Sequence, residues 1–265
     1  AAPNQELNEM KYDSISAYLE DGITHEDGSQ SGARIIALLE AGTPSSFVNL
    51  ISKVGISPGE HNVADAISNV AGQVMTPLIQ NANSQFNRES GTGITDQLDV
   101  VFFPETTSIN MILAEEDMPP QVQITPLVIS TPASWLETNS EEVNFDPTAD
   151  ILGPFALASI VTIRGTIDED PELAIGKPQA KIVVFGDADF AKNKFFFSSD
   201  NGDLLLNSVN WLAEDYDLIS VRPKLIAFRE LVVNTRELEF IKWSSWFIPP
   251  AIMILLGAII WWRRR

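Results

Sequence analysis

The sequence predicts an α/β domain with a largely parallel sheet flanked by helices, followed by one transmembrane helix. Three observations predict it. Strand-like apolar runs alternate with amphipathic helical patterns. The composition, 45% hydrophobic and 20% charged, is that of a folded chain long enough for a sizeable core. A long uncharged stretch lies next to the C-terminal end of the sequence.

The first elements follow from residue spacing. Residues 6–20 have loosely helical apolar spacing, and a polar, glycine-rich loop follows them. Residues 33–42 predict a buried strand that ends at Gly42. The next segment predicts an amphipathic helix with Gly55 as its C-cap, whose apolar face comprises Phe47, Leu50, Ile51 and Val54. A strand followed by a helix and a glycine stop is typical of a βα unit.

Four more strands and one helix are expected downstream. The strands are 99–109, closed by Pro104, then 124–131, 155–165 and 181–185. Between them, 56–96 is polar and irregular, 133–154 is a long polar connection, and 166–179 is an acidic loop. Residues 201–215 predict a helix that Asn201 or Asp203 caps, with an apolar stripe of Leu205, Val209 and Leu212.

Charge and residue types exclude several functions. The formal net charge is −19, which disfavours nucleic acid and anionic lipid partners. The chain has no cysteine, which excludes disulfides, thiolate nucleophiles and cysteine-ligated metals, and His25 and His61 are too few for a histidine metal site. There is no phosphate-binding glycine loop and no G-x-S-x-G elbow. We therefore expect no cofactor, no resident metal and no nucleotide-hydrolysing motor within the chain.

The C-terminal segment predicts a membrane anchor. No residue from Trp246 to Trp262 is charged, and this length is near the short end for a spanning helix. Tryptophans bracket the segment, and Arg263, Arg264 and Arg265 follow it, which predicts a cytoplasmic C-terminus and an extracytoplasmic domain. Pro249 and Pro250 are expected in the first turns of this helix, and Gly257 is tolerated in membrane helices. The anchor residues are thus Trp246, Pro249, Pro250, Gly257, Trp261, Trp262 and Arg263–Arg265.

The first ten residues, AAPNQELNEM, have neither a basic region nor an apolar region of a signal peptide. Because an extracytoplasmic domain must be exported, we expect the chain to be a mature form or a fragment whose targeting segment precedes Ala1.

Asp187 and Asp189 are the best candidates for a site. They follow a strand at the position where open α/β sheets place ligands, and two carboxylates could hold Mg²⁺ with water. Aspartate and asparagine at strand ends also shape turns, and Asp187, Asn193 and Asn201 could all serve that purpose. The candidate ligand or partner residues are Asp187, Asp189, Asn193, Asn201 and Trp135.

The order of motifs resembles the auxiliary component of ABC-type transport systems, a family related to a gliding-motility protein of the same kind. The likeness covers most of the chain and is strongest over 124–265. It rests on Gly186, Asp187, Asp189 and Phe190; Asn201, Gly202 and Asp203; Asn207, Asn210, Trp211 and Leu212; and Arg222, Pro223 and Lys224. Family members usually have a further N-terminal half and an N-terminal membrane helix. They also usually have a tight turn before a strand, and in this chain the polar insertion at 22–32 interrupts that turn.

The resemblance implies a fold similar to glutamine-amidotransferase-like and flavodoxin-like domains, and no catalytic residues. It further implies a non-enzymatic, membrane-anchored, extracytoplasmic auxiliary subunit in the cytoplasmic membrane, whose partners are separate permease and ATPase chains. Two alternatives remain open: a free-standing surface-anchored module that binds polysaccharide or protein, and a metal-dependent hydrolase that uses Asp187 and Asp189. The expected organisation is a domain over 1–215, a membrane-proximal link over 216–242 and the anchor over 243–265.

Overall fold

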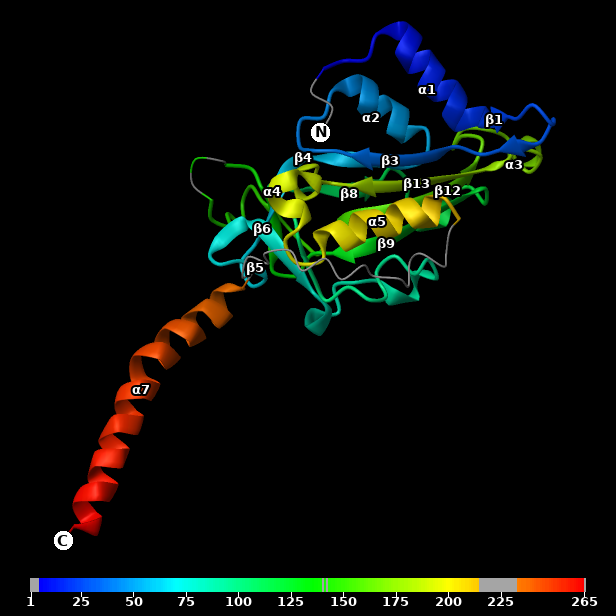
Figure 1. Cartoon of the computed structure of the whole chain (residues 1–265). Coiled ribbons are helices and arrows are strands. Elements are labelled where there is room, and N and C mark those ends of the chain that lie inside the picture. Colours follow the sequence, from blue (N-terminus) through cyan, green and yellow to red (C-terminus); the bar gives the residue numbers. More distant parts are fainter. Residues whose placement is uncertain (1–4, 140, 142, 215–232, 265) are drawn as a thin grey trace.

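A four-stranded sheet forms the centre of the folded domain in the computed structural model, which describes residues 5–139, 141, 143–214 and 233–264 (Figure 1). The strand order is β3-β13-β12-β9. The strands are β3 (Arg34–Leu38), β13 (Gln179–Phe185), β12 (Ala156–Arg164) and β9 (Val122–Ile129).

The expectation of a largely parallel, flavodoxin-like sheet is wrong. Only β3 and β13 pair in parallel, and the other eight pairings among the described strands are antiparallel. The reason lies in the connections, since a parallel neighbour normally requires a crossover helix. Between β12 and β13 the chain forms only α3 (Pro171–Ala174), and those two strands pair as an antiparallel ribbon. The fold is a mixed, mostly antiparallel structure with several sheets.

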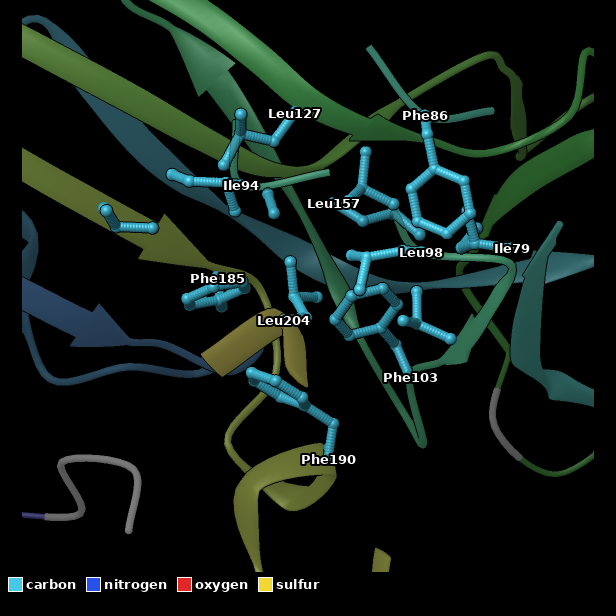
Figure 2. Close-up of a cluster of buried hydrophobic side chains, with 14 of the residues drawn as sticks. Ile79, Phe86, Ile94, Leu98, Phe103, Leu127, Leu157, Phe185, Phe190 and Leu204 are labelled. Atoms are coloured by element: carbon cyan, nitrogen blue, oxygen red, sulfur yellow. The ribbon is translucent and has the colours of Figure 1, made fainter. Parts of the chain in front are cut away.

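Helices cover both faces of the central sheet (Figure 1). Helices α1 (Glu9–Asp21) and α2 (Ser45–Ser52) lie on one face, and α5 (Asn201–Leu212) lies on the other. Strand β13 alternates accordingly: Ile182 and Val184 pack toward α1 and α2, whereas Val183 and Phe185 pack into the core on the α5 side (Figure 2). The strand is therefore buried on both faces, which explains its continuous apolar sequence.

Two regions that we expected to be irregular contain strands. About half of 56–96 forms β4 (Ile56–Asp65), β5 (Asn69–Val70) and β6 (Gln73–Gln80), and the connection 133–154 contains β10 (Ser134–Glu137) and β11 (Ile151–Leu152). The strand expected over 99–109 is two strands, β7 (Val100–Phe102) and β8 (Thr107–Met111), on either side of Pro104. These strands form the sheets β11-β10-β4-β8 and β5-β6-β7.

Small elements complete the domain. The strands β1 (Ile23–Thr24) and β2 (Gln30–Ser31) pair within the expected polar loop, and α4 (Asn193–Phe196) precedes α5. The short 3-10 turns are η1 (Asn81–Asn83), η2 (Arg88–Ser90), η3 (Glu115–Asp117) and η4 (Asp189–Ala191).

The helix α5 is where the sequence predicts it, but its cap and its stripe differ. Asp200 occupies the N-cap position. The buried face is shifted from the expected one, because Val209 is exposed and Leu205 is only half-buried, whereas Leu204, Trp211 and Leu212 are buried. Leu204 enters the core beside Phe185 and Phe103 (Figure 2).

One helix is long and apolar enough to span a membrane. Helix α7 (Thr235–Arg263) projects away from the domain, and none of its apolar segment is buried against other described residues (Figure 1). It begins well before Trp246 because Asn234 and Glu237 form a capping box. Pro249 and Pro250 therefore lie in the helix interior, not in its first turns as expected.

Candidate functional site

Three acidic residues lie just after the ends of two parallel strands, at one edge of the central sheet. Strands β3 and β13 pair in parallel up to Leu38 and Phe185, so their carboxyl ends meet there. Glu40 follows β3, and Asp187 and Asp189 follow β13. One carboxylate oxygen of each lies within 4.8 Å of the other two. The sequence predicted the two aspartates and missed Glu40, although its position just after a strand was a usable signal.

The turn after β13 is fixed by close packing. A Cβ on Gly186 would lie 2.0 Å from the carbonyl oxygen of Thr107, so only glycine fits at this approach. The backbone N–H of Thr107 donates to the Gly186 carbonyl at 2.7 Å. Phe190 is completely buried, with ring centroids 4.8 Å from Phe185 and 5.2 Å from Phe103 (Figure 2). The G-D-x-D-F motif therefore joins the sheet to the core.

Asp187 is almost completely buried and closes this turn. Its Oδ1 accepts a hydrogen bond from the backbone N–H of Asp189 at 2.5 Å, and its Oδ2 accepts one from Phe190 at 3.2 Å. Burial raises the pKa of Asp187 to about 8, and the charges of Asp189 and Glu40 add to the rise, while the two backbone hydrogen bonds oppose it. The carboxyl group is thus mostly protonated at neutral pH.

Asp189 is half-buried and forms an ion pair with Lys192, one turn further along the chain. The hydrogen bond that Lys192 donates to the Asp189 carboxylate raises the pKa of Lys192. This lysine places one positive charge beside three acidic groups, so the cluster is partly neutralised by the chain itself.

A polar hollow of about 260 Å³ opens beside the cluster. Its lining includes Glu40, Asp189 and Lys192, together with Asn62 on β4, a strand that the sequence did not predict, and Glu105 in the turn between β7 and β8. Carboxylate oxygens are the ligands that Mg²⁺ and Ca²⁺ prefer, so the three acidic residues could hold a divalent cation. A protonated Asp187 would have to release its proton to do so.

Asn193 and Asn201 do not belong to this cluster. Asn193 is exposed at the start of α4. Asn201 is completely buried, and its side chain pairs with the backbone of Phe102 on β7: Oδ1 accepts from the N–H at 3.0 Å and Nδ2 donates to the C=O at 3.2 Å. The neighbouring Asp200 accepts from the backbone N–H groups of Asp99 and Val100, at 2.7 and 3.1 Å. This motif anchors α5 to β7.

Trp135 lies in a different sheet. It sits on β10, is buried, and its Nε1 donates to Glu137 at 2.9 Å. Its ring meets Phe145 edge-on at 6.1 Å. We therefore find a packing role for Trp135 and no contact with the acidic cluster among the described residues.

The anchor residues that the structure describes lie on α7 or at its C-cap. Trp246, Trp261 and Trp262 are exposed, as expected for side chains that face lipid, and a Cβ on Gly257 would meet nothing within 4 Å. Arg263 ends the helix and Arg264 caps it. Arg265 lies outside the described residues, as do 216–232 of the predicted link, including Arg222, Pro223 and Lys224.

Comparisons with known proteins show no family. No family model matches the chain, and no curated protein matches it. Among solved structures, the mmIFT52 N-terminal domain is 13% identical, with a TM-score of 0.48 over 80% of this chain and 74% of that one. A ThuA-like protein from Bacteroides uniformis is 11% identical, with a TM-score of 0.36 over 80% of this chain and 66% of that one. Likenesses this distant identify no function.

Proposed function

We propose that the protein is a non-enzymatic auxiliary subunit of an ABC-type transport complex, anchored by α7. The observation that carries the proposal is the exposed apolar helix that leaves the folded domain and ends in arginines. A fully exposed apolar surface of this length has to be covered, by lipid or by other membrane helices. In the proposed complex, a multispan permease covers part of it, and a separate chain supplies the ATPase.

The charge at the end of α7 sets the proposed orientation. Arg263–Arg265 place positive charge after the apolar segment, which favours a cytoplasmic C-terminus by the positive-inside rule. The acidic domain then faces the extracytoplasmic side of the cytoplasmic membrane. A strongly negative domain is also repelled by anionic lipid head groups, which favours a position away from the membrane surface.

The roles of the motif residues are structural, which argues against catalysis by these side chains. Gly186 permits the approach of Thr107, Asp187 holds two backbone N–H groups, and Asn201 is fully engaged with Phe102. A side chain whose hydrogen bonds hold its own backbone is less available to a substrate. Packing and hydrogen bonds within the fold are therefore enough to explain the presence of these residues in the motif on which the family resemblance rests.

The first experiment tests the orientation of the chain in the membrane. Because the sequence has no cysteine, only an introduced cysteine is labelled. Single cysteines replace Asp27, an exposed residue of the domain, or Arg264, and a membrane-impermeant maleimide is added to intact cells and to lysed cells. We expect Asp27→Cys to be labelled in both and Arg264→Cys only after lysis. The reverse pattern would contradict the proposed topology.

The second experiment tests the complex. The tagged full chain is purified in a mild detergent, and the co-purifying proteins are identified by mass spectrometry. We expect an ATPase and a multispan membrane protein in stoichiometric amounts. Recovery of the chain without either protein would refute the transport role and leave a free-standing anchored binding module.

A second candidate function, a metal-dependent hydrolase, is favoured by the three acidic residues around Asp187. It predicts that Mn²⁺ or Mg²⁺ raises the melting temperature of the full chain and that Asp189→Asn abolishes the effect. A melting temperature independent of divalent cations would eliminate it. Asp168→Asn, an exposed carboxylate elsewhere on the domain, serves as the control.

A further inference from the structure

The α5 face of the central sheet changes from apolar to polar along β13. Val183 and Phe185 are buried under α5, but the preceding residues on that face are Lys181 and Gln179. The strands beside β13 also change from apolar to polar residues, at the same level of the sheet. Two cross-strand rows of polar side chains result, Arg34–Lys181–Thr162–Gln123 and Gln179–Arg164–Gln121.

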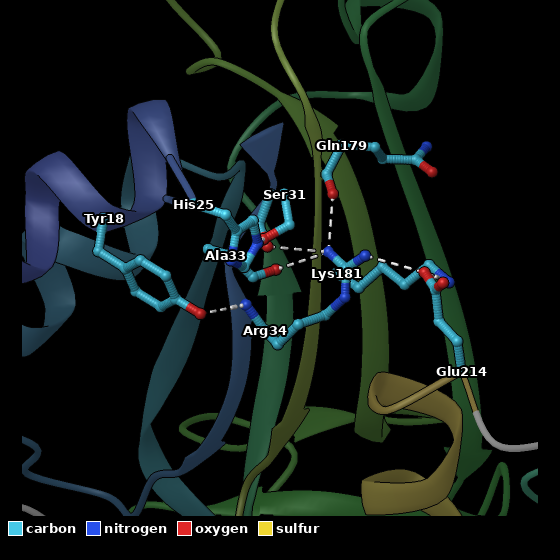
Figure 3. Close-up of polar contacts among 9 residues, drawn as sticks. Tyr18, His25, Ser31, Ala33, Arg34, Gln179, Lys181 and Glu214 are labelled. Carbon is cyan, nitrogen blue, oxygen red and sulfur yellow. Dashed lines mark hydrogen bonds and ion pairs between the residues drawn. The ribbon is translucent and has the colours of Figure 1, made fainter. Parts of the chain in front are cut away.

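In the first row, the two cations are neutralised (Figure 3). Arg34 and Lys181 both contact Oε1 of Glu214, at 2.9 and 3.0 Å. Lys181 also lies over the ring of Trp211, 5.2 Å from its centroid. Arg34 donates to the carbonyl of Gln179 at 2.8 Å (Figure 3). These contacts hold the end of α5 against β3 and β13, so they need no ligand to explain them.

Arg164 in the second row is different. Its Nη1 donates to the carbonyl oxygen of Lys177 at 2.8 Å, and no carboxylate pairs with it within the described part of the chain. One N–H is used out of the five that a guanidinium carries. The nearby Lys177 is neutralised by Asp21 and Glu169. Arg164 is therefore a half-buried cation with unused donors.

Arg164 lines an open hollow of about 310 Å³. Gln121, Gln123, Thr162 and Gln179 share its lining, so residues with carboxamide and hydroxyl groups border the same hollow as Arg164. Oε1 of Gln121 is one of two buried side-chain atoms without a hydrogen-bond partner among the described residues. Pro171 and Ile175 add an apolar wall. The volume is at the lower end of the range for small-molecule sites.

We infer that this hollow binds a sugar acid, a polyhydroxylated ring with a single carboxylate. The planar fork of Arg164 matches a carboxylate in a bidentate arrangement. Carboxamides and a hydroxyl both donate and accept, as sugar hydroxyls do, and an apolar wall suits the C–H face of the ring.

The charge of the domain favours a ligand with one negative charge. Residues 1–214 have nine Lys and Arg against 31 Asp and Glu, a formal charge of −22. Such a domain repels nucleic acids and polyphosphates, which carry many negative charges. A ligand with one carboxylate carries a single negative charge, which the positive charge of Arg164 neutralises. The inference rests on the proposed role of the domain as a binding subunit, and it names the place and the ligand class.

The test measures binding of D-glucuronate, D-glucose and inorganic phosphate to the full chain by calorimetry. The detergent must have no sugar head group, so that it does not compete. We expect D-glucuronate to bind at least tenfold more tightly than either D-glucose or phosphate. Equal affinity for glucose, tighter binding of phosphate, or no binding of glucuronate would overturn the inference.

Matched variants locate the site. Arg164→Gln should weaken glucuronate binding at least tenfold, whereas Arg88→Gln should leave it unchanged within twofold. Arg88 is the appropriate control because it also donates to one backbone carbonyl, that of Leu98, and forms no ion pair that the structure describes. Gln123→Ala, at an exposed position, should weaken binding by a few-fold without affecting folding. Unchanged affinity in both Arg164→Gln and Gln123→Ala would refute the site.

The two proposals fail separately. Co-purification with an ATPase and a permease, but no binding of glucuronate, would retain the transport role and remove the sugar-acid site. Glucuronate binding that depends on Arg164, in a chain that purifies alone, would retain the site and remove the transport role.

Discussion

Replacement of Asp187 by asparagine should change how the stability of the protein depends on pH. The buried carboxyl group has a pKa of about 8 in the folded state, against 3.8 for an ordinary aspartate. At a pH between those two pKa values, the carboxyl group is protonated in the folded state and ionised in the unfolded state. The free energy of unfolding therefore falls as the pH rises through this range. The slope is about 1.4 kcal/mol per pH unit. From pH 5 to pH 7 the ionisation of Asp187 should lower the free energy of unfolding of the wild type by about 2.7 kcal/mol. An asparagine variant, which has no ionisable group at this position, should not show this decrease.

The assay is urea unfolding of the full chain in detergent, followed by tryptophan fluorescence, since Trp135 and Trp211 are buried in the domain. Asp187→Asn should cost about 1–3 kcal/mol at pH 5, because the amide can accept only one of the two backbone hydrogen bonds, and the deficit should shrink or reverse by pH 7. Asp168→Asn, a surface carboxylate, should parallel the wild type. Parallel profiles for the wild type and Asp187→Asn would refute the argument that burial keeps this carboxyl protonated.

Three further substitutions test the packing and the anchor. Gly186→Ala should destabilise the domain by about 3 kcal/mol in urea unfolding, because its Cβ would lie 2.0 Å from a backbone oxygen; Gly176→Ala, whose nearest neighbour would be 3.8 Å away, is the control. Asn201→Ala should cost about 3 kcal/mol by the same measurement, since it leaves a buried backbone N–H and C=O unpaired; a loss under 0.5 kcal/mol would contradict this. Leu255→Arg should make insertion of α7 about 3 kcal/mol less favourable, and alkaline carbonate should then extract more of the chain from membranes; unchanged extraction would mean that α7 does not span.

Local patterns predicted most of the long elements. Helices α1, α2 and α5 and strands β3, β9, β12 and β13 all occur where spacing and apolar runs placed them. Strand pairing was not predictable in this way, because direction depends on the length and content of the connections. The alternation of strands with helices suggested crossovers, but β4 carries a polar sequence with Pro58 and Gly59, and its pairing partners are far away in the chain.

The candidate sites were predictable to different extents. Asp187 and Asp189 were found from their position after an apolar strand, and Glu40 could have been found by the same rule. Arg164 could not, because its lack of a carboxylate partner appears only when the strands are placed in register. The anchor was the clearest signal, since an uncharged segment with arginines after it needs no tertiary information. The start of its helix depended on the cap at Asn234.

The proline pair in α7 has a mechanical consequence. The two residues immediately before the helix are tied to the domain, because Val233 accepts a hydrogen bond from Ala71 and Asn234 forms a β-bridge with Val70. Pro249 and Pro250 remove two helical hydrogen bonds, and helices bend most easily at such points. From Asn234 to the prolines the helix forms an arm of about 22 Å. A change of about 20° in the bend would swing the β5–β6 hairpin through about 8 Å, so a small tilt within the membrane would become a large displacement of the domain outside it.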